Sequence, residues 1–404
     1  MYRILHIIDT LNYGGAERQL LLNVSALDRS LFQSYICCVE EEGALAATAA
    51  ELGVPVYSLG IRGKPQWPQA VFRLGRLLRS LKIDLIHTSL ADADILGAAA
   101  SRFWGIPAVS TLCSIAGGPE RMIDNPQITG FKLAVNNKLW GLALRSGHRR
   151  CIAISQAVKQ SSIKVYGLRE EKLSVIYRSL PDSWFTAALG TGPDHLRATL
   201  GLENAYPILL NVGRLVPAKG QRYLLQAMPQ VLARFPQARL LIAGEGPLRG
   251  ALETLVQELG IAPQVNLLGR RSDVRDLLAL SDIFVFPSVF EGLGASLVEA
   301  AGMGKPCIAS RVGPIPEVVE EGKSGMLVPS RSPQALAQAI IELAGDRERA
   351  AAMGRRGREI AQDKFRIAPA IQQLEALYRQ LLPTAGRTGD LREGRGDVGV
   401  EVRG

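Results

Sequence analysis

The sequence predicts an α/β protein made of two doubly wound units, each with a mostly parallel sheet covered by helices. Short apolar runs, typical of buried strands, alternate with helical stretches along residues 2–154. The same alternation restarts at Ile208, after a segment rich in glycine, proline and aspartate. The length of 404 residues also leaves room for two domains of ordinary size.

The composition limits the class of protein and its partners. Hydrophobic residues make up 47% of the chain and charged residues 21%, so a substantial core is expected. The net charge of +9 favours anionic partners such as nucleotides or phospholipid surfaces. Nucleic acid is not expected, because aromatic residues are only 6% and no known nucleic-acid-binding module is present.

Cysteine usage and hydropathy bear on location. The five cysteines have no CxxC spacing, which favours a reducing compartment over a zinc site or disulfides. The first residues go directly into a predicted strand, so we expect no secretory signal and a cytoplasmic location. No uncharged apolar run reaches the length of a membrane span.

The first unit opens with a predicted strand at Tyr2–Ile8 and a glycine turn at Asn12–Arg18, which begins a helix. The turn is not GxGxxG, so Gly14 and Gly15 either cradle an anion or form a plain tight turn. Further strands are expected at Tyr35–Val39, Val54–Ser58, Leu85–Thr88, Ala108–Leu112 and Cys151–Ile154.

Ligands of parallel sheets bind where the strands end, and His87 and Cys113 lie at two such ends. A lone histidine is more often structural than catalytic, so that alternative stays open for His87.

Two segments of the first half, Arg62–Lys82 and Phe131–Arg150, are basic and contain no acidic residue. The first carries apolar residues at helical spacing, and the second carries Trp140 and several leucines between its cations. Basic amphipathic helices with aromatic residues can lie on anionic membrane surfaces. The alternative for each is a domain helix with a solvated basic face. The pair, together with the net charge, favours membrane contact.

The second unit follows an expected linker at Pro181–Pro207. Its strands are expected at Ile208–Val212, Leu240–Ala243, Val265–Leu267, Ile283–Phe286, Cys307–Ser310 and Met326–Val328. An amphipathic helix is expected at Ala368–Leu382, and the glycine-rich stretch Thr384–Gly404 is expected to be disordered. The expected divisions are 1–185, 200–365, 366–383 and 384–404.

An anion site is expected directly after the strand Ile283–Phe286. A turn with Gly292 and Gly294 leads into a helix that opens near Ala295 or Ser296, and its free N–H groups suit an anion. Glu291 and Glu299 flank this site, where carboxylates are better suited to sugar hydroxyls than to phosphate. An ordinary strand, loop and helix with a solvated Glu299 is the alternative.

Two cations lie in a second glycine loop, Gly213–Gly220. Arg214 and Lys219 follow the strand Ile208–Val212, so they lie at an edge where ligands bind. Together they can neutralise a diphosphate, with arginine forming paired bonds and lysine acting as a point charge.

Several stretches in this order resemble glycosyltransferase family 4, the glycosyl transferases group 1. They are TLNYGGAERQL (10–20), GRLVPAKG (213–220), AGEGP (243–247), LGRRSDV (268–274), EGLGASLVEAAGMGKPCIAS (291–310) and GPIPEVVEEGKSGMLVP (313–329). The resemblance implies the GT-B fold, in which two Rossmann-like domains face each other across a cleft and a C-terminal helix returns to the N-terminal domain.

The resemblance also implies roles for individual residues. Arg214 and Lys219 would hold the donor diphosphate, Glu291 would bond sugar hydroxyls, and these three would form the catalytic set. Glu299 would bind the ribose hydroxyls. The implied donor-binding set is Gly14, Gly15, Gly213, Arg214, Lys219, Arg271, Glu291, Gly292, Gly294, Ala295, Ser296, Leu297 and Glu299, with His87 and Cys113 on the acceptor side.

Three positions depart from the family pattern. Many relatives carry a histidine where this chain has Cys113, and a thiol cannot act as a cationic donor at neutral pH. Some relatives read HTH where this chain has His87-Thr88-Ser89. An asparagine-glycine pair before the linker is usual, and here it is Arg178-Ser179.

The implied function is transfer of a sugar from a UDP- or GDP-sugar to a glycan or lipid-linked acceptor, with retention and without metal or cofactor. It would serve polysaccharide or cell-envelope synthesis, with reversible contact at the cytoplasmic face of an anionic membrane. The alternatives are a nucleotide-sugar epimerase of the same fold and a degenerate sugar-nucleotide-binding subunit.

Overall fold

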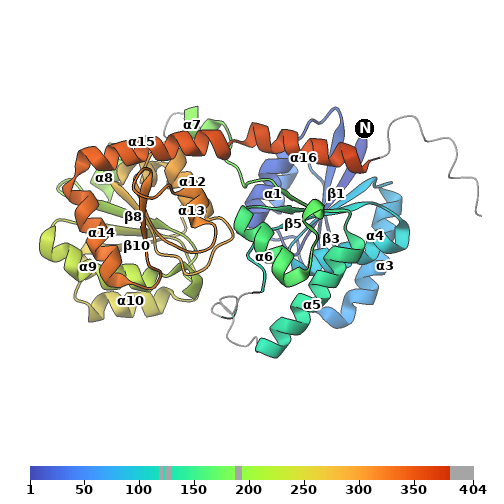
Figure 1. Ribbon diagram of the computed structural model, residues 1–404, viewed down its shortest axis with the longest axis horizontal. Helices are drawn as coiled ribbons and strands as arrows, with labels where there is room; N and C mark the ends of the chain where they lie inside the picture. The colour runs from blue at the N-terminus through green and yellow to red at the C-terminus, as the bar shows by residue number, and fades with distance from the viewer. Residues whose placement is uncertain (118–121, 123–128, 187–192, 383–404) are drawn as a thin grey trace, which may run out of the picture.

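The computed structural model describes residues 1–117, 122, 129–186 and 193–382. Two parallel sheets lie side by side along the long axis of the molecule, each with helices against it, and the C-terminal helices run across both (Figure 1). The predicted pair of doubly wound units is therefore confirmed. The tail expected to be disordered, 384–404, and residues 187–192 of the expected linker lie outside the described residues.

The N-terminal sheet has seven parallel strands in the order β3-β2-β1-β4-β5-β6-β7. Their bounds are β1 Tyr2–Ile8, β2 Phe32–Cys38, β3 Val56–Ser58, β4 Leu85–Ser89, β5 Ala108–Leu112, β6 Arg150–Ala153 and β7 Leu173–Val175. Strand β7 was not predicted, because this edge strand has only three residues and a serine at its centre. The other six lie within three residues of their expected positions.

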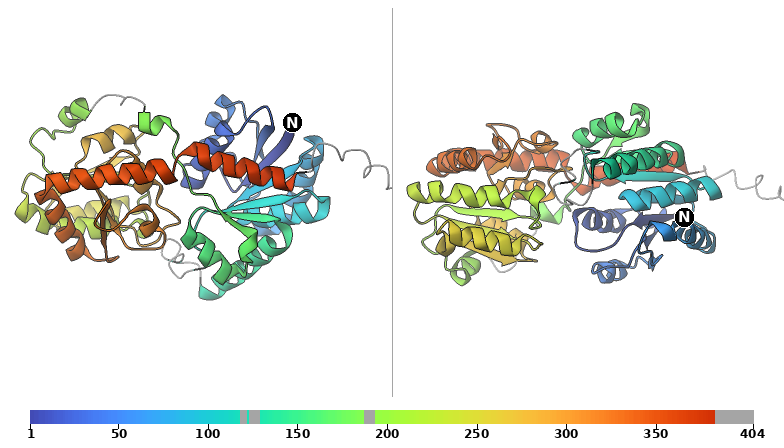
Figure 2. Two further views of the ribbon diagram at one scale, coloured as in Figure 1. Left: turned by 45° about the horizontal axis from the view of Figure 1, so that its top comes forward. Right: turned by 90° about the horizontal axis from the view of Figure 1, so that it is seen from below.

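Seven helices accompany this sheet within the described residues. They are α1 Gly15–Ala26, α2 Ala46–Glu51, α3 Trp67–Ser80, α4 Ala91–Trp104, α5 Gly130–Gly147, α6 Gln156–Tyr166 and α7 Ser183–Thr186. Figure 2 shows helices on both faces of the sheet. Because both faces are covered, β1 reads as a nearly continuous apolar run, and its residues 4–8 are buried.

The C-terminal sheet has six parallel strands in the order β10-β9-β8-β11-β12-β13. Their bounds are β8 Ile208–Val212, β9 Arg239–Ala243, β10 Val265–Gly269, β11 Ile283–Phe286, β12 Cys307–Ser310 and β13 Gly325–Val328. The helices of this half are α8 Pro193–Thr199, α9 Gln221–Arg234, α10 Arg249–Glu258, α11 Val274–Leu280, α12 Ala295–Gly302, α13 Ile315–Val318, α14 Pro333–Gly345 and α15 Arg347–Lys364.

Part of the expected linker is folded. Helix α8 packs against α11, and Leu196 is buried in the same core as Leu277 and Leu278. This helix was not predicted, because it has only seven residues and the sequence around it is rich in glycine and proline.

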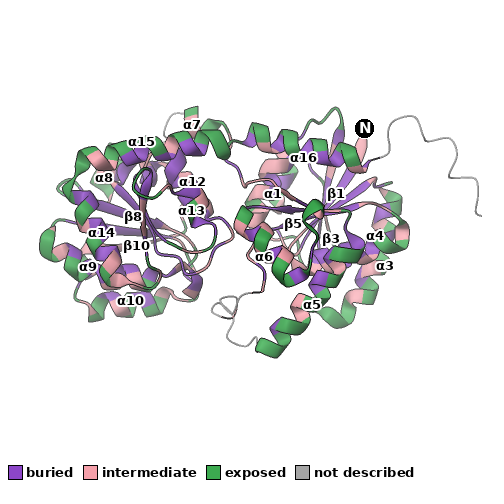
Figure 3. Ribbon diagram, viewed as in Figure 1, coloured by how far each residue is buried: buried purple, intermediate pink, exposed green. Residues whose placement is uncertain are grey.

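The last helix, α16 (Ile367–Leu381), returns to the N-terminal sheet as expected. Its buried stripe packs against Ile4, Phe32, Leu85 and Val109, which lie on four strands of that sheet. Figure 3 shows this stripe as alternating buried and exposed turns along the helix. The chain therefore passes between the halves twice. The two connecting segments are joined by backbone hydrogen bonds of Leu180 to Phe365 and Ile367.

Both sheets reverse their strand order at one point, between β1 and β4 and between β8 and β11. Such switch points are where open α/β sheets bind ligands. The loops after β1 and β11 therefore start from the two switch points. The loops of the two halves meet, since Ser155 Oγ after β6 donates to the Gly292 carbonyl after β11 over 2.9 Å.

Candidate active site

The loop after β8 places Lys219 beside a carboxylate. Lys219 Nζ lies 2.5 Å from Glu291 Oε1, and the two side chains are 23% and 8% exposed. The ammonium also lies 5.7 Å from the centre of the Phe286 ring. Arg214, in the same loop, is exposed at the cleft, and its carbonyl accepts a hydrogen bond from Gln221 Nε2. The loop thus holds one fixed cation and one free to reach a ligand.

The loop after β11 ends at Gly294, which begins α12. Its φ of +91° favours glycine, and a side chain there would crowd Phe286 and Ile315. The N–H of Leu297 donates to the Gly294 carbonyl, so the expectation that this amide faces a ligand is not met. Ala295 and Ser296 keep N–H groups without a hydrogen bond among the described residues, and Ser296 Oγ anchors the turn to the Val212 carbonyl. Two amides and the helix dipole remain for an anion.

Glu299 lies one turn inside α12 and is half-buried. Burial raises the pKa of its carboxyl, while Arg178 and Arg18 oppose that rise. The backbone beside it is fixed, because Trp184 Nε1 on α7 donates to the Glu299 carbonyl over 3.1 Å. A half-buried carboxylate near cations suits charge-assisted hydrogen bonds to hydroxyl groups.

The glycine loop after β1 contacts charged side chains from outside it. Arg178 donates to the Gly15 carbonyl, and its guanidinium occupies the space that a side chain on Gly15 would need. Glu17 folds back over Gly14 in the same way. Burial raises the pKa of Glu17, and Arg178 and Arg214 oppose that rise, so Arg214 of the second half acts on this loop of the first.

The stretch after β10 gives its two arginines different contacts. Arg271 forms a paired ion bridge to Asp273, with Nε and Nη2 at 2.8 and 2.5 Å from the two carboxylate oxygens. Arg270 stacks on Tyr13, with its guanidinium carbon 4.2 Å from the ring centre. The second contact joins this stretch to the glycine loop of the other half.

Further contacts hold the two halves together beside the cleft. Glu317 of α13 accepts from the Gln156 and Ala157 amides at the start of α6, over 2.8 and 2.9 Å, and from Tyr177 Oη. A side chain on Gly292 would collide with the Cys113 carbonyl. Glycine at position 292 therefore permits the close approach of the two halves.

His87 does not reach the cleft. Its Nδ1 lies 2.5 Å from Tyr378 Oη and its Nε2 lies 2.7 Å from Thr111 Oγ1, and the residue is only 5% exposed. Burial lowers the pKa of its imidazole to about 3, helped by His148. With both ring nitrogens occupied inside the core, the structural alternative holds and His87 is removed from the acceptor side.

Cys113 does lie where the two halves meet, next to Gly292. It is half-buried, and its Sγ lies 3.5 Å from the Thr111 carbonyl. Burial raises the pKa of the thiol to about 12, and Arg178 opposes that rise. A thiol that stays protonated is neither a nucleophile nor a cation at neutral pH.

No role was predicted for four residues that act on the candidate site, namely Glu17, Arg18, Tyr13 and Arg178. The first three belong to the motif around Gly14 and Gly15, so the helical positions after the turn could have pointed to them. Arg178 was noted only as a departure from the family pattern, and only the chain crossing brings it to the glycine loop.

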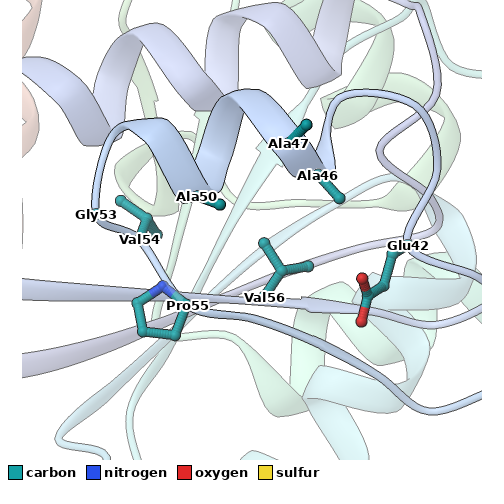
Figure 4. Close-up of a pocket in the computed structure, with 8 residues that line it drawn as sticks. All are labelled: Glu42, Ala46, Ala47, Ala50, Gly53, Val54, Pro55 and Val56. Carbon is teal, nitrogen blue, oxygen red and sulfur yellow. The ribbon is translucent and has the colours of Figure 1, made fainter.

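The described residues also line a hollow outside this site. A shallow hollow between α2 and β3 is lined by alanines, Val54, Pro55 and Val56, with Glu42 at its rim (Figure 4). The described residues contain no group of three side chains suited to a metal ion. They also contain no helix with the length and apolarity to cross a bilayer.

Two family models match the chain in succession. The model described as Glycosyltransferase Family 4 matches residues 13–183, and the model described as Glycosyl transferases group 1 matches residues 194–360. They follow the two sheets in order. The candidate-site residues of the first half therefore lie within one model, and those of the second half lie within the other.

Curated relatives match over different lengths. The N-acetyl-alpha-D-glucosaminyl L-malate synthase of Bacillus anthracis is 33% identical over 187 residues, 46% of this chain and 49% of that protein. The chain thus spans about half the length of this relative. The alpha-D-kanosaminyltransferase of Streptomyces kanamyceticus is 30% identical over 302 residues, 72% of this chain and 76% of that enzyme.

A solved structure confirms the fold over nearly the whole chain. HepE of Anabaena, crystallised with UDP and glucose, superposes with a TM-score of 0.83 and 25% identity. The match covers 94% of this chain and 100% of that one. The expected GT-B architecture is therefore confirmed.

Proposed function

The chain belongs to glycosyltransferase family 4, and from this premise we propose that it moves a sugar from a nucleotide-diphosphate sugar to a hydroxyl acceptor with retention of configuration. The observation that carries the proposal is the convergence of Arg214, Lys219 and the free amides of α12 beside Glu291 and Glu299. Cations and amides suit the diphosphate, and the carboxylates suit the sugar hydroxyls.

The donor would lie at the switch point of the C-terminal sheet. The diphosphate would contact Arg214, Lys219 and the amides of Ala295 and Ser296, while Glu299 would accept from the ribose hydroxyls. Glu291 would bond hydroxyls of the transferred sugar, and the base would lie near Arg271. UDP is the first nucleotide to test, because HepE was crystallised with it.

The reaction needs only charge stabilisation and positioning from the protein. The bond between the anomeric carbon and the β-phosphate oxygen breaks, and the acceptor oxygen bonds to the same face of that carbon. The acceptor proton passes to the departing phosphate oxygen, and the nucleoside diphosphate leaves. Arg214, Lys219 and the α12 amides would stabilise the negative charge on the leaving group, and binding in one cleft would hold both substrates together.

No metal is proposed for this reaction. The two cations and the helix N-terminus supply the positive charge that a divalent ion would otherwise bring to a diphosphate. Retention is proposed from family membership.

The acceptor is proposed to be a glycan or lipid-linked sugar at an anionic membrane, in cytoplasmic cell-envelope synthesis. The support is a surface of the N-terminal half. Helix α5 exposes Phe131, Val135, Leu139 and Leu142, which follow one another at helical spacing, with exposed Lys132, Lys138 and Arg145 around them. The five cysteines are all free thiols, as expected in a reducing compartment.

The basic segment 62–82 lies on the same side as α5. Lys64 Nζ donates to Asn136 Oδ1 of α5 over 3.2 Å. Helices α3 and α5 both lie below the N-terminal sheet in the view of Figure 1. The apolar residues Leu74 and Leu78 of α3 are buried in the core, so its cations and Phe72 form its exposed face. Helix α5 supplies the apolar stripe, and α3 supplies charge.

The deciding experiment mixes the purified protein with UDP- and GDP-sugars, with and without lipid-linked and free sugar acceptors. A transferase releases nucleoside diphosphate rapidly only when an acceptor is present. Turnover without acceptor would support an epimerase or hydrolase, and binding without turnover under any condition would support a degenerate binding subunit.

A further inference from the structure

Arg178 contacts the glycine loop after β1 from a distant segment of the chain. It lies between β7 and the crossing to the second half, and its guanidinium rests against Gly15, donating to that residue's carbonyl. A residue with a side chain at position 15 would displace it. The glycine turn, for which the sequence left an anion cradle and a plain tight turn both open, therefore has a cation against it.

The backbone around Arg178 is held from two sides. The Ser179 N–H donates to Gln19 Oε1 and Gln19 Nε2 donates to Ser179 Oγ, both over 3.1 Å. The next residue, Leu180, bonds to Phe365 and Ile367 where the chain crosses back. Arg178 is thus fixed to α1 and lies two residues from the point that joins the halves.

The guanidinium faces carboxylates without pairing with any of them. Burial lowers the pKa of Arg178, while Cys113, Glu299, Glu17 and Glu291 act in the opposite direction, so acidic groups of both halves lie near it. Among the described residues it forms no ion pair, and its one hydrogen bond uses a single N–H of five. Its remaining donors are available to a ligand.

We infer that Arg178 is a third cation of the donor site, supplied by the N-terminal half, which binds phosphate oxygens of the donor diphosphate across from Arg214 and Lys219. The inference rests on the proposed function. A guanidinium matches two phosphate oxygens at once, which a surface lysine cannot do. Arg178 and Arg214 both oppose the rise in the pKa of Glu17, so both arginines act on the glycine loop after β1.

A purely structural role fits the contacts less well. A half-buried arginine such as Arg178, if kept for stability, is expected to pair with a carboxylate, because a charge partly removed from water needs compensation. Three carboxylates are near, and none is bonded. One consequence follows: donor binding would join a cation of the first half to the diphosphate held by the second, and so favour closure of the cleft.

The test uses UDP and GDP as probes, with uridine and guanosine as the matching ligands that lack the diphosphate. In Arg178→Gln the affinity for the nucleoside diphosphate should fall roughly 10- to 100-fold, and nucleoside affinity should not change. Arg178→Lys should lie between, as a point charge without the paired geometry. Arg169→Gln, on the exposed surface of the same segment, is the matched control and should bind like the wild type.

The outcomes separate the explanations. Equal losses for nucleotide and nucleoside would make Arg178 a support of the fold and overturn the inference. Unchanged UDP affinity with a raised KM for acceptor would assign Arg178 to an acceptor anion and overturn it as well. If the wild type binds neither UDP nor GDP, the proposed function itself fails. If the wild type binds and Arg178→Gln binds equally well, only the inference fails.

Discussion

Lys219 and Glu291 are joined across the proposed donor site, with 2.5 Å between Nζ and Oε1 and little exposure of either side chain. They come from the loops that follow β8 and β11, which are tied by the Val289 amide bonding to the Ala218 carbonyl over 2.8 Å. The ion pair fixes the ammonium before any substrate arrives, as charge stabilisation in a preorganised site requires. Removing either partner leaves the other charge without compensation.

We expect Lys219→Ala and Arg214→Ala each to lower turnover by about 10²- to 10³-fold at saturating acceptor, because each removes a fixed positive charge from the leaving diphosphate. Steady-state release of nucleoside diphosphate measures the effect. Arg222→Ala, on the exposed face of α9 a few residues away, is the control and should be near wild type. A folded Lys219→Ala protein with wild-type turnover would contradict the assignment.

Glu299→Ala should weaken donor binding by about 1.5–3 kcal/mol, because it removes charge-assisted hydrogen bonds to the ribose. Calorimetry with UDP and with 2′,3′-dideoxy-UDP gives a sharper result than the variant alone. If Glu299 binds those hydroxyls, Glu299→Ala combined with the dideoxy ligand should weaken binding about as much as either change alone. Additive losses would place the carboxylate elsewhere, and Glu258→Ala on exposed α10 should leave both affinities unchanged.

A chelator should leave turnover nearly unchanged. The proposed site neutralises the diphosphate with two loop cations and the amides that open α12, and no step requires a divalent ion. The measurement compares rates in EDTA and in excess Mg²⁺. Loss of activity in EDTA that Mg²⁺ restores would require a different arrangement around the phosphates.

The burial of His87 predicts a pH dependence of stability. Burial lowers the pKa of His87 to about 3, below the value of about 6.5 expected in the unfolded chain. Between these values the unfolded state binds a proton that the folded state excludes. This contribution to stability is therefore present above pH 6.5 and is lost as the pH falls, by about 2 kcal/mol at pH 5.

Urea unfolding at pH 7 and pH 5 isolates this term. His87→Asn should lose less stability on acidification than the wild type, even if it is less stable at both values. Tyr378→Phe removes the hydroxyl 2.5 Å from Nδ1 but keeps the imidazole, so it should retain the wild-type pH slope. Identical slopes in His87→Asn and wild type would show that His87 titrates normally.

The elements at the centre of each sheet were predictable because their apolar runs are continuous. Strands β5, β8, β11 and β12 begin and end where the sequence analysis expected, since strands buried on both faces carry a strong signal. Strand β7 and helix α8 were missed, because an edge strand of three residues and a helix of seven carry little periodicity.

The residues proposed for the donor side could be chosen from local motifs, because Gly213–Gly220 and Glu291–Glu299 each form one continuous loop and helix start. The role proposed for Arg178 could not, because its contact with Gly15 joins residues 163 positions apart in sequence. Local spacing also failed for His87, whose position after a strand end suggested a ligand contact. Tyr378 of α16, 291 residues later in the sequence, bonds to the His87 ring inside the core instead.

Helix α5 allows the membrane proposal to be divided into two parts. Its exposed stripe contains Phe131 at 79% and Leu142 at 55% exposure, an apolar face that water does not favour. Its exposed cations, with those of α3, would each contribute about 1 kcal/mol near an anionic leaflet. Four such contacts would give roughly 4 kcal/mol, or about a thousandfold in partitioning, before the costs of binding.

Sedimentation with vesicles of rising anionic lipid content should separate charge from insertion. Replacing Arg73, Arg76 and Arg79 by glutamate should reduce binding most at low salt, because screening at high salt already weakens this term. Replacing Phe131, Leu139 and Leu142 by serine should reduce binding at low and high salt alike, because burial of apolar area is not screened.

The matched control carries the same charge reversals on the other half, at Arg222, Arg234 and Arg355. If the control loses as much binding as the α3 variant, net charge alone is responsible. If the wild type stays in the supernatant at every lipid composition, the membrane proposal fails and a free acceptor becomes the better explanation.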